Sequence, residues 1–242
     1  MIEILEILEN NLIAKDTFKM VLKTNNMAKK ATCGQFINIS LNDKERLLRR
    51  PISINEIIDD KIVINYKILG DGTKILSQMK KFDKLNVLGP LGKGFNVLSN
   101  NSLLIGGGIG CSPLLELAKK LDNPTIILGF KTKEEIYDLE KFSSLGNIII
   151  TTDDGSYGFK GHPLEYLKSN NLKFDVFYAC GPLRMLEGLE KLYSDKEAYL
   201  SYEQHMACGV GLCHGCVVGH PHKCVCTEGP VFKVGELYGS KC

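Results

Sequence analysis

Residues 103–121 read LLIGGGIGCSPLLELAKKL, and this stretch decides the fold of the second half of the chain. Three apolar residues run directly into Gly106-Gly107-Gly108-Ile109-Gly110, and the residues from Pro113 onward predict a helix. Pro113 suits the first helical turn, where its missing N–H is not needed. Glycines let the backbone approach a phosphate, and a helix N-terminus attracts one, so the stretch favours a nucleotide site over a ligand-free turn.

This stretch departs from the standard dinucleotide fingerprint in two ways. Pro113 stands where the last glycine of G-x-G-x-x-G would fit. The apolar run at 125–128 is followed by GFKTKEE, with no acidic residue directly at its end. The sequence therefore predicts a nucleotide site of a different type.

The alternation of strands and helices continues on both sides of this stretch and predicts a parallel, Rossmann-like α/β sheet. Leucines at steps of three from Leu183 to Leu192 predict one apolar helical face. The expected strands are 103–105, 125–129, 147–151, 175–179 and 198–200, and the expected helices are 113–121, 133–142, 162–169 and 182–193.

The N-terminal part follows a different pattern. From residue 2 to about 95 it consists of short alternating or β-branched runs separated by turn residues, which predicts an all-β antiparallel barrel or sandwich. One short helix is expected at 73–80, with Thr73 as its cap. We therefore expect three regions: a β-barrel at 1–98, an α/β domain at 99–200 and a small cysteine-rich domain at 201–242.

Composition excludes several classes of function. The chain has 242 residues and a net charge of +2, so no broad basic surface is expected to bind nucleic acid. No basic segment followed by an apolar stretch opens the chain, and the longest apolar run is interrupted by glycines, so neither a signal peptide nor a membrane span is expected. Nine cysteines without a secretory signal predict a reducing cytoplasm, where clustered thiols bind metal or do redox chemistry.

The cysteines near the end have a diagnostic spacing. Cys208, Cys213 and Cys216 form C-x4-C-x2-C, and Cys226 follows. This is the plant-type [2Fe–2S] spacing, in which four thiolates hold the two irons. Zinc is the main alternative, but structural zinc sites usually pair C-x2-C with a second C-x2-C, which is absent from this sequence. The spacing favours the cluster.

Several motifs together resemble the ferredoxin–NADP reductase superfamily, which joins a flavin-binding antiparallel barrel to a nicotinamide-binding α/β domain. The motifs, in order, are Arg50-Pro51-Ile52-Ser53, GDGT, LGPLGKGF, GGGIGCSPL, TDDGSYGFKG and YACGPLRML. The Arg-Pro-Ile-Ser form and the cysteine tail resemble, more narrowly, the electron-transfer subunits of NAD-linked, two-subunit bacterial dihydroorotate dehydrogenases. Taken alone, Arg50 is more typical of a basic loop that enters a strand.

The resemblance implies a set of cofactor-binding residues. FAD would contact Arg50, Pro51, Ile52, Ser53, Asn65, Tyr66 and Lys67, with Gly72 and Thr73 at its diphosphate. The NAD site would be formed by Gly106, Gly107, Gly108 and Gly110.

The resemblance also bears on three further features. Cys180 would lie near the flavin–nicotinamide contact as the candidate catalytic residue, although a small apolar filler is an open alternative. The family's fourth cluster cysteine directly precedes an acidic-Gly-Pro stretch, which selects Cys226 over Cys224. A Ser-x-Glu pattern before the cysteines is matched by Ser201 and Glu203.

The implied function is half of an enzyme. Electrons would run from the FMN of a dihydroorotate dehydrogenase catalytic subunit through [2Fe–2S] and FAD to NAD+, in pyrimidine biosynthesis, and a heterotetramer is the family expectation. One alternative keeps the cofactors and changes the partner: a ferredoxin:NADP oxidoreductase or sulfide dehydrogenase subunit. Another is a zinc-stabilised nucleotide-binding module without electron transfer. The choice of NAD over NADP stays open, because Lys131 and Lys133 can attract a 2′-phosphate.

Overall fold

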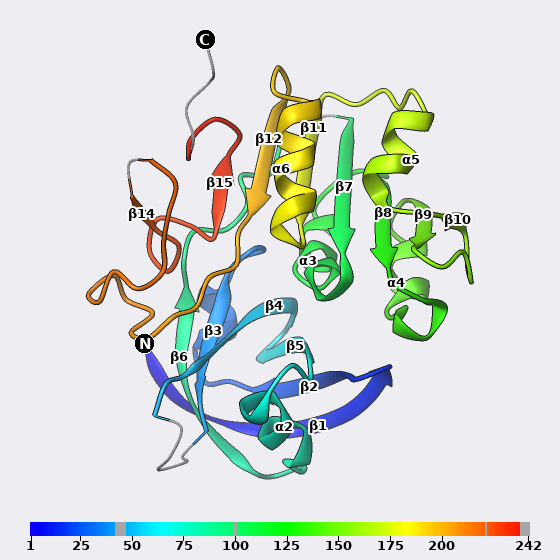
Figure 1. The fold of residues 1–242 in the computed structure, drawn as a ribbon. Helices are drawn as coiled ribbons and strands as arrows, with labels where there is room; N and C mark the ends of the chain where they lie inside the picture. Colours follow the sequence, from blue (N-terminus) through cyan, green and yellow to red (C-terminus); the bar gives the residue numbers. More distant parts are fainter. Residues whose placement is uncertain (42–46, 99–100, 221, 238–242) are drawn as a thin grey trace.

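The N-terminal part of the chain is a closed antiparallel barrel, as predicted (Figure 1). The computed structural model describes residues 1–41, 47–98, 101–220 and 222–237, so residue 99, the expected start of the second region, lies outside the described residues. The barrel strands, in pairing order, are β1 (Ile2–Ala14), β2 (Thr17–Lys23), β5 (Lys61–Lys67), β4 (Arg50–Ile58), β3 (Phe36–Ser40) and β6 (Lys84–Leu91).

Alternation along the strands fills the barrel. Ile37 and Ile39 of β3 are fully buried in its interior, together with Ile54, Ile62 and Ile64. Because successive side chains of a strand point to opposite faces, Phe36 and Asn38 of the same strand face outward. That outward face is covered by the C-terminal part of the chain, since Phe36 belongs to the core of that part.

Two short helices accompany the barrel, α1 (Met27–Lys30) and α2 (Asp71–Gln78). Helix α2 confirms the expected helix but begins two residues earlier, so Thr73 lies inside its first turn and is not the cap. The Thr73 hydroxyl accepts a hydrogen bond from the N–H of Leu69 at 3.0 Å. It therefore ties the preceding turn to the helix.

The second half of the chain forms a seven-stranded sheet that is parallel except for β15. All five expected strands are present, while β10 and β15 were not anticipated. The strands, in sheet order, are β10 (Phe159–Lys160), β9 (Asn147–Thr152), β8 (Thr125–Phe130), β7 (Ser102–Gly107), β11 (Val176–Cys180), β12 (Glu197–Ser201) and β15 (Val231–Lys233).

Helices cover both faces of this sheet. Leu103 and Ile105 of β7 pack in the core that contains residues of α5 and α6, whereas Leu104 packs with α3 on the other face. The helical elements are η1 (Gly108–Cys111), α3 (Leu114–Ala118), η2 (Lys133–Glu135), α4 (Leu139–Ser143), α5 (Pro163–Ser169) and α6 (Leu183–Leu192).

Two details of the helices differ from expectation. The helix expected at 133–142 is divided into η2 and α4, because Asp138 between them has a left-handed backbone, with φ at 52°. In α6, Leu186 and Leu189 are buried, but Leu183 is 50% exposed and Leu192 36%. Three residues advance a helix by about 300°, so leucines at steps of three drift off the buried face by about 60° per step.

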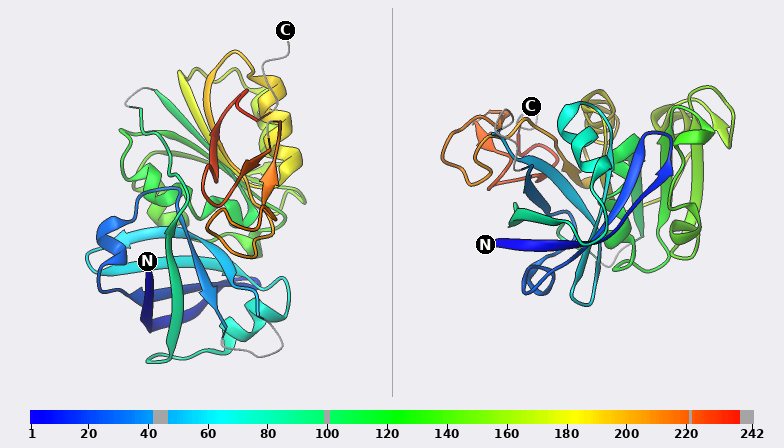
Figure 2. Two further views of the ribbon diagram at one scale, coloured as in Figure 1. Left: turned by 90° about the vertical axis from the view of Figure 1, so that its left-hand side faces the viewer. Right: turned by 90° about the horizontal axis from the view of Figure 1, so that it is seen from below.

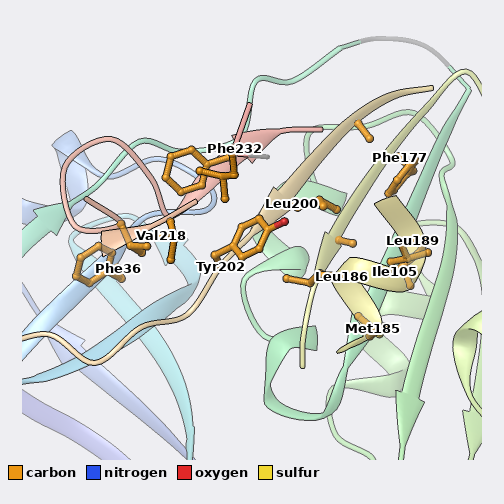
Figure 3. Close-up of a cluster of buried hydrophobic side chains, with 14 of the residues drawn as sticks. Phe36, Ile105, Phe177, Met185, Leu186, Leu189, Leu200, Tyr202, Val218 and Phe232 are labelled. Carbon is orange, nitrogen blue, oxygen red and sulfur yellow. The ribbon is translucent and has the colours of Figure 1, made fainter. Parts of the chain in front are cut away.

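The C-terminal region does not form a separate core. Its hairpin, β13 (Val217–Val218) and β14 (Lys223–Cys224), lies beside the barrel and the sheet (Figures 1 and 2), and its strand β15 pairs antiparallel with β12. Figure 3 shows one continuous apolar core running from Phe177 past Leu200 and Tyr202 to Val218 and Phe36. The boundaries at 98/99 and 200/201 remain predictions.

No helix in the described part of the chain is both long enough and apolar enough to span a membrane.

Candidate functional site

A cavity of about 520 Å³ lies where the barrel, η1 and the segment after β12 meet. Eight of the nine residues predicted to contact FAD line it. These are Arg50, Pro51, Ile52, Ser53, Asn65, Tyr66, Lys67 and Thr73.

Gly72, the ninth, lies beneath Arg50. A Cβ built on Gly72 would come within 2.2 Å of the Arg50 Nε. The guanidinium therefore lies over the first turn of α2, where free N–H groups and the helix dipole already favour an anion. Arg50 and this turn together offer a positively charged end of the cavity.

The β5 residues are held by partners outside the cavity. Tyr66 stacks on Phe18 with ring centroids 5.7 Å apart, and its hydroxyl donates to Asn10 Oδ1 at 2.8 Å. Burial raises the pKa of Tyr66 well above its usual value, so the phenol stays protonated. Asn65 donates through Nδ2 to Asp138 Oδ2 at 2.8 Å.

Unmatched polar atoms in the cavity fit a large polar ligand. Asn65 Oδ1 and Ser112 Oγ belong to cavity-lining residues and are buried without a hydrogen-bond partner in the described part of the chain. Such orphans are rare in folded proteins unless water or a ligand meets them. Among its lining residues the cavity thus has an amide and a hydroxyl without protein partners, together with the Arg50 guanidinium, and this chemistry fits a flavin nucleotide.

A second cavity, of about 140 Å³, lies at the carboxyl ends of β7 and β8, where α/β sheets bind their ligands. Gly107 and Gly108 line it, and Gly108 has a left-handed φ of +56° with open space at its Cβ position. Lys67 lines both cavities and forms an ion pair with Glu135 at 2.8 Å. The two cavities are therefore neighbours.

Gly106 and Gly110 serve packing. A Cβ on Gly106 would lie 2.7 Å from Cys111 Sγ, and one on Gly110 would lie 2.6 Å from the Cys180 carbonyl oxygen. Both glycines allow the backbones to approach, whereas Gly107 and Gly108 line the cavity itself.

Cys180 is 1% exposed and is not among the residues that line either cavity. It pairs in register with Ser201, which lines the large cavity, so it lies one strand away. Burial, reinforced by the nearby Glu203 carboxylate, raises the pKa of the Cys180 thiol, which is therefore protonated at neutral pH.

The loop that carries Cys208, Cys213 and Cys216 directs backbone N–H groups at thiol sulfurs. Cys208 Sγ accepts from the N–H of Val210 and of Cys213, each at 3.4 Å, and the first of these contributes most to lowering the pKa of Cys208 to about 6. Cys226 Sγ accepts from the N–H of Gly211 at 3.2 Å. These bonds favour thiolates, so the chemistry of the donors, four cysteine sulfurs with N–H groups directed at Cys208 and Cys226, suits iron.

Cys224 differs from Cys226 in its surroundings. Both thiols are buried, and burial raises the pKa of each, that of Cys226 to about 12. Cys224 Sγ lies 3.8 Å from His214 Nδ1, whereas Cys226 takes the Gly211 N–H. Within the described residues, no three His, Cys, Asp or Glu side chains are grouped in a way that could hold a metal ion.

Sequence reasoning missed part of the cavity wall. Ser112 gave no signal, because it reads as the residue before a helix-starting proline. The Ser-x-Glu pattern, matched by Ser201 and Glu203, drew attention to segment 201–206 but did not indicate that it forms a wall of the large cavity. The cavity is lined by Ser201 at the end of β12 and by the residues that follow it: Tyr202, Glu203, Gln204, His205 and Met206.

Comparison with known proteins gives a consistent result. Residues 203–238 match the family described as the iron–sulfur cluster binding domain of dihydroorotate dehydrogenase B. The chain is 42% identical to the dihydroorotate dehydrogenase B (NAD(+)) electron transfer subunit of Fusobacterium nucleatum subsp. nucleatum, covering 95% of each chain. It is 41% identical to that of Bacillus mycoides, covering 93% of this chain and 94% of the relative.

Among solved structures, one described as an NADH-dependent reduced ferredoxin-NADP oxidoreductase superposes with a TM-score of 0.85. It is 29% identical, with 97% of this chain and 90% of that chain covered. The match extends over the barrel, the α/β sheet and the C-terminal region alike.

Proposed function

Because this chain belongs to the family of dihydroorotate dehydrogenase B (NAD(+)) electron transfer subunits, we propose that it connects a dihydroorotate-oxidising subunit to NAD+. Its cofactors are FAD, a [2Fe–2S] cluster and NAD. When bound, the flavin exchanges two electrons with a nicotinamide and single electrons with an iron–sulfur centre. The observation that carries this proposal is the shared wall: the segment 201–206 lines the large cavity and leads directly into Cys208.

The large cavity would hold FAD. Arg50 and the first turn of α2, with Gly72 and Thr73, would bind the diphosphate, because charge and free N–H groups converge there. The backbone of Pro51, Ile52 and Ser53 and the residues Asn65, Tyr66 and Lys67 would enclose the ring. Tyr66 is fixed by its bond to Asn10 and so offers a rigid surface.

The small cavity would hold part of NAD, with its phosphates against Gly107 and Gly108, while Gly106 and Gly110 keep the turn closed. Cys180 would act as a buried, neutral thiol that holds Ser201 and the adjoining wall in place next to the reacting rings. Its position beside two lining elements supports this role.

The cluster would be held by Cys208, Cys213, Cys216 and Cys226. The N–H bonds to Cys208 and Cys226 support this choice, because they stabilise the thiolates that iron requires. Cys224 would be a neighbouring buried thiol.

The partner would be an FMN-containing catalytic subunit in a heterotetramer. Support comes from the cluster loop, where Leu212 is 81% exposed and Val210 41%, since exposed apolar side chains mark docking surfaces. A cytoplasmic location is supported by the free thiol state of every cysteine that the structure describes.

The test is the visible spectrum of anaerobically purified protein, before and after NADH, with iron and acid-labile sulfide measured for Cys226→Ser and Cys224→Ser. We expect flavin and cluster bands that NADH bleaches, loss of sulfide in Cys226→Ser and near-complete sulfide in Cys224→Ser. A colourless protein that contains zinc would overturn the proposal. Full sulfide in Cys226→Ser would overturn the ligand assignment alone.

The similar ferredoxin-NADP oxidoreductase structure supports a second candidate, in which the same cofactors serve another partner. Dihydroorotate-dependent NADH formation by the chain mixed with its co-purifying partner distinguishes the two.

A further inference from the structure

A fully buried amide without a partner lies where the barrel meets the cluster loop. Asn38 is 0% exposed, and among the residues that the structure describes neither its Nδ2 nor its Oδ1 has a hydrogen-bond partner. Burying an amide without a partner is costly, so such a residue calls for a ligand at this position.

The strand geometry places this amide between the two proposed cofactor sites. Asn38 faces outward from β3 on the same side as Phe36, and it pairs in register with Pro51 of β4. Phe36 and Pro51 both line the large cavity. Asn38 is thus one pleat away from the cavity, on the face that the C-terminal region covers.

Its nitrogen rests against the cluster loop. A Cβ built on Gly209 would lie 2.6 Å from Asn38 Nδ2, so Gly209, directly after Cys208, leaves the space that the amide occupies. The main-chain carbonyl of Asn38 accepts a hydrogen bond from Arg49 Nη1 at 3.2 Å, which ties down the backbone of β3 at this residue.

The cluster loop, which Asn38 Nδ2 contacts at Gly209, presents cysteine sulfurs as acceptors. The loop already directs the N–H groups of Val210, Gly211 and Cys213 at cysteine sulfurs, and each thiolate or sulfide accepts more than one hydrogen bond. We propose that the Asn38 side-chain amide donates to the sulfur atoms of the bound cluster and raises its reduction potential. This inference rests on the cluster ligands proposed above.

Electrostatics determines in which direction the Asn38 amide shifts the reduction potential of the cluster. A donor to sulfur stabilises the more negative, reduced cluster over the oxidised one, because a hydrogen bond to a more highly charged group is stronger. Asn38 would be a positioning residue for electron transfer, placed so that the cluster stays reducible next to the flavin.

The experiment is a redox titration of the full chain, followed by the paramagnetic signal of the reduced cluster, in Asn38→Leu and Asn38→Gln. Leu has the same number and branching of side-chain heavy atoms as Asn but lacks the N–H, and we expect it to shift the reduction equilibrium about tenfold toward the oxidised cluster, or roughly 60 mV lower for one electron. Asn38→Gln keeps the amide and should recover at least part of the shift. Asn55→Leu removes another fully buried amide, which donates to the Ser112 carbonyl, and should leave the potential unchanged.

A second measurement covers the case in which Asn38→Leu loses its cluster. Wild-type protein with 15N in its asparagine amides should show a nitrogen coupling to the reduced cluster that Asn38→Gln, labelled in the same way, lacks. A potential equal to wild type in loaded Asn38→Leu, or no such coupling in wild-type protein, would overturn the proposal. Iron and sulfide content measured in parallel separates this failure from a failure of the ligand assignment.

Discussion

At the scale of single residues, the packing of Arg50 against Gly72 shapes the proposed FAD site. A methyl group on Gly72 would meet the Arg50 Nε at 2.2 Å and push the guanidinium away from the first turn of α2. We expect Gly72→Ala to weaken FAD binding about tenfold, which corresponds to about 1.4 kcal/mol, because one bidentate anion contact is misplaced. The measurement is fluorescence titration of the apoprotein with FAD.

Gly70 provides the matched control two residues earlier. It lies at the same turn, its φ of −169° is ordinary extended backbone, and a Cβ there meets nothing within 4 Å. Gly70→Ala should keep FAD affinity within about twofold of wild type. Equal losses in both variants would mean that the turn, and not Arg50, determines binding.

Arg50 and its neighbours line one cavity because a motif of adjacent residues on one strand folds locally, so the sequence could group them. Ser112 and Asn38 could not be predicted in this way. Their meaning depends on which distant segment covers them: the cavity lies over Ser112, and the loop at Gly209 lies over Asn38. A buried orphan amide is a property of tertiary packing and leaves no local pattern.

At the scale of elements, the break between η2 and α4 connects the two main parts of the molecule. Asp138 occupies the break, pairs with Lys19 of β2 and accepts from Asn65 of β5. Its side chain is 4% exposed, so its loss leaves two barrel groups without their partner. We expect Asp138→Ala to lower the free energy of unfolding by about 2–3 kcal/mol, measured by urea denaturation.

Asp138→Asn separates charge from geometry. Asparagine tolerates the left-handed backbone and keeps an acceptor for Asn65, so only the ion pair with Lys19 is lost. We expect it to cost less than half as much as alanine. If Asp138→Asn lowered the free energy of unfolding as much as Asp138→Ala, the whole effect would come from the charge.

This break also explains why the prediction of one continuous helix at 133–142 was wrong. The local residues favour a helix throughout, but the contacts of Asp138 with Lys19 and Asn65 of the barrel stabilise the structure more than a continuous helix would. Tertiary contact here overrides local propensity. The strands 125–129 and 147–151 were predictable because the strands of a parallel sheet that is covered on both faces form continuous apolar runs.

At the scale of the whole molecule, the C-terminal region is continuous with the rest. Strand β15 extends the α/β sheet, and Val218, Cys226 and Phe232 share one core with Ile105 and other residues under α6 (Figure 3). Composition indicated a third region from the change in cysteine content. It could not show that this region also builds one wall of the large cavity, because that depends on how segment 201–206 crosses from β12 to the cluster loop.

Because the C-terminal region is continuous with the rest, we predict that loss of the cluster weakens FAD binding. Without the cluster, the loop from Cys208 to Cys216 loses the bonds from its thiolates to iron, and the adjoining wall at 201–206 loses that anchor. We expect Cys208→Ser to weaken FAD binding roughly tenfold and to raise amide hydrogen exchange in 201–218, while the interior strands of the barrel keep their protection. Cys224→Ser is the control, since it changes a buried thiol of the same core and should retain both cluster and affinity. Unchanged FAD affinity in cluster-free Cys208→Ser would mean that the wall is held by the shared apolar core alone, through Tyr202 packed against Phe232.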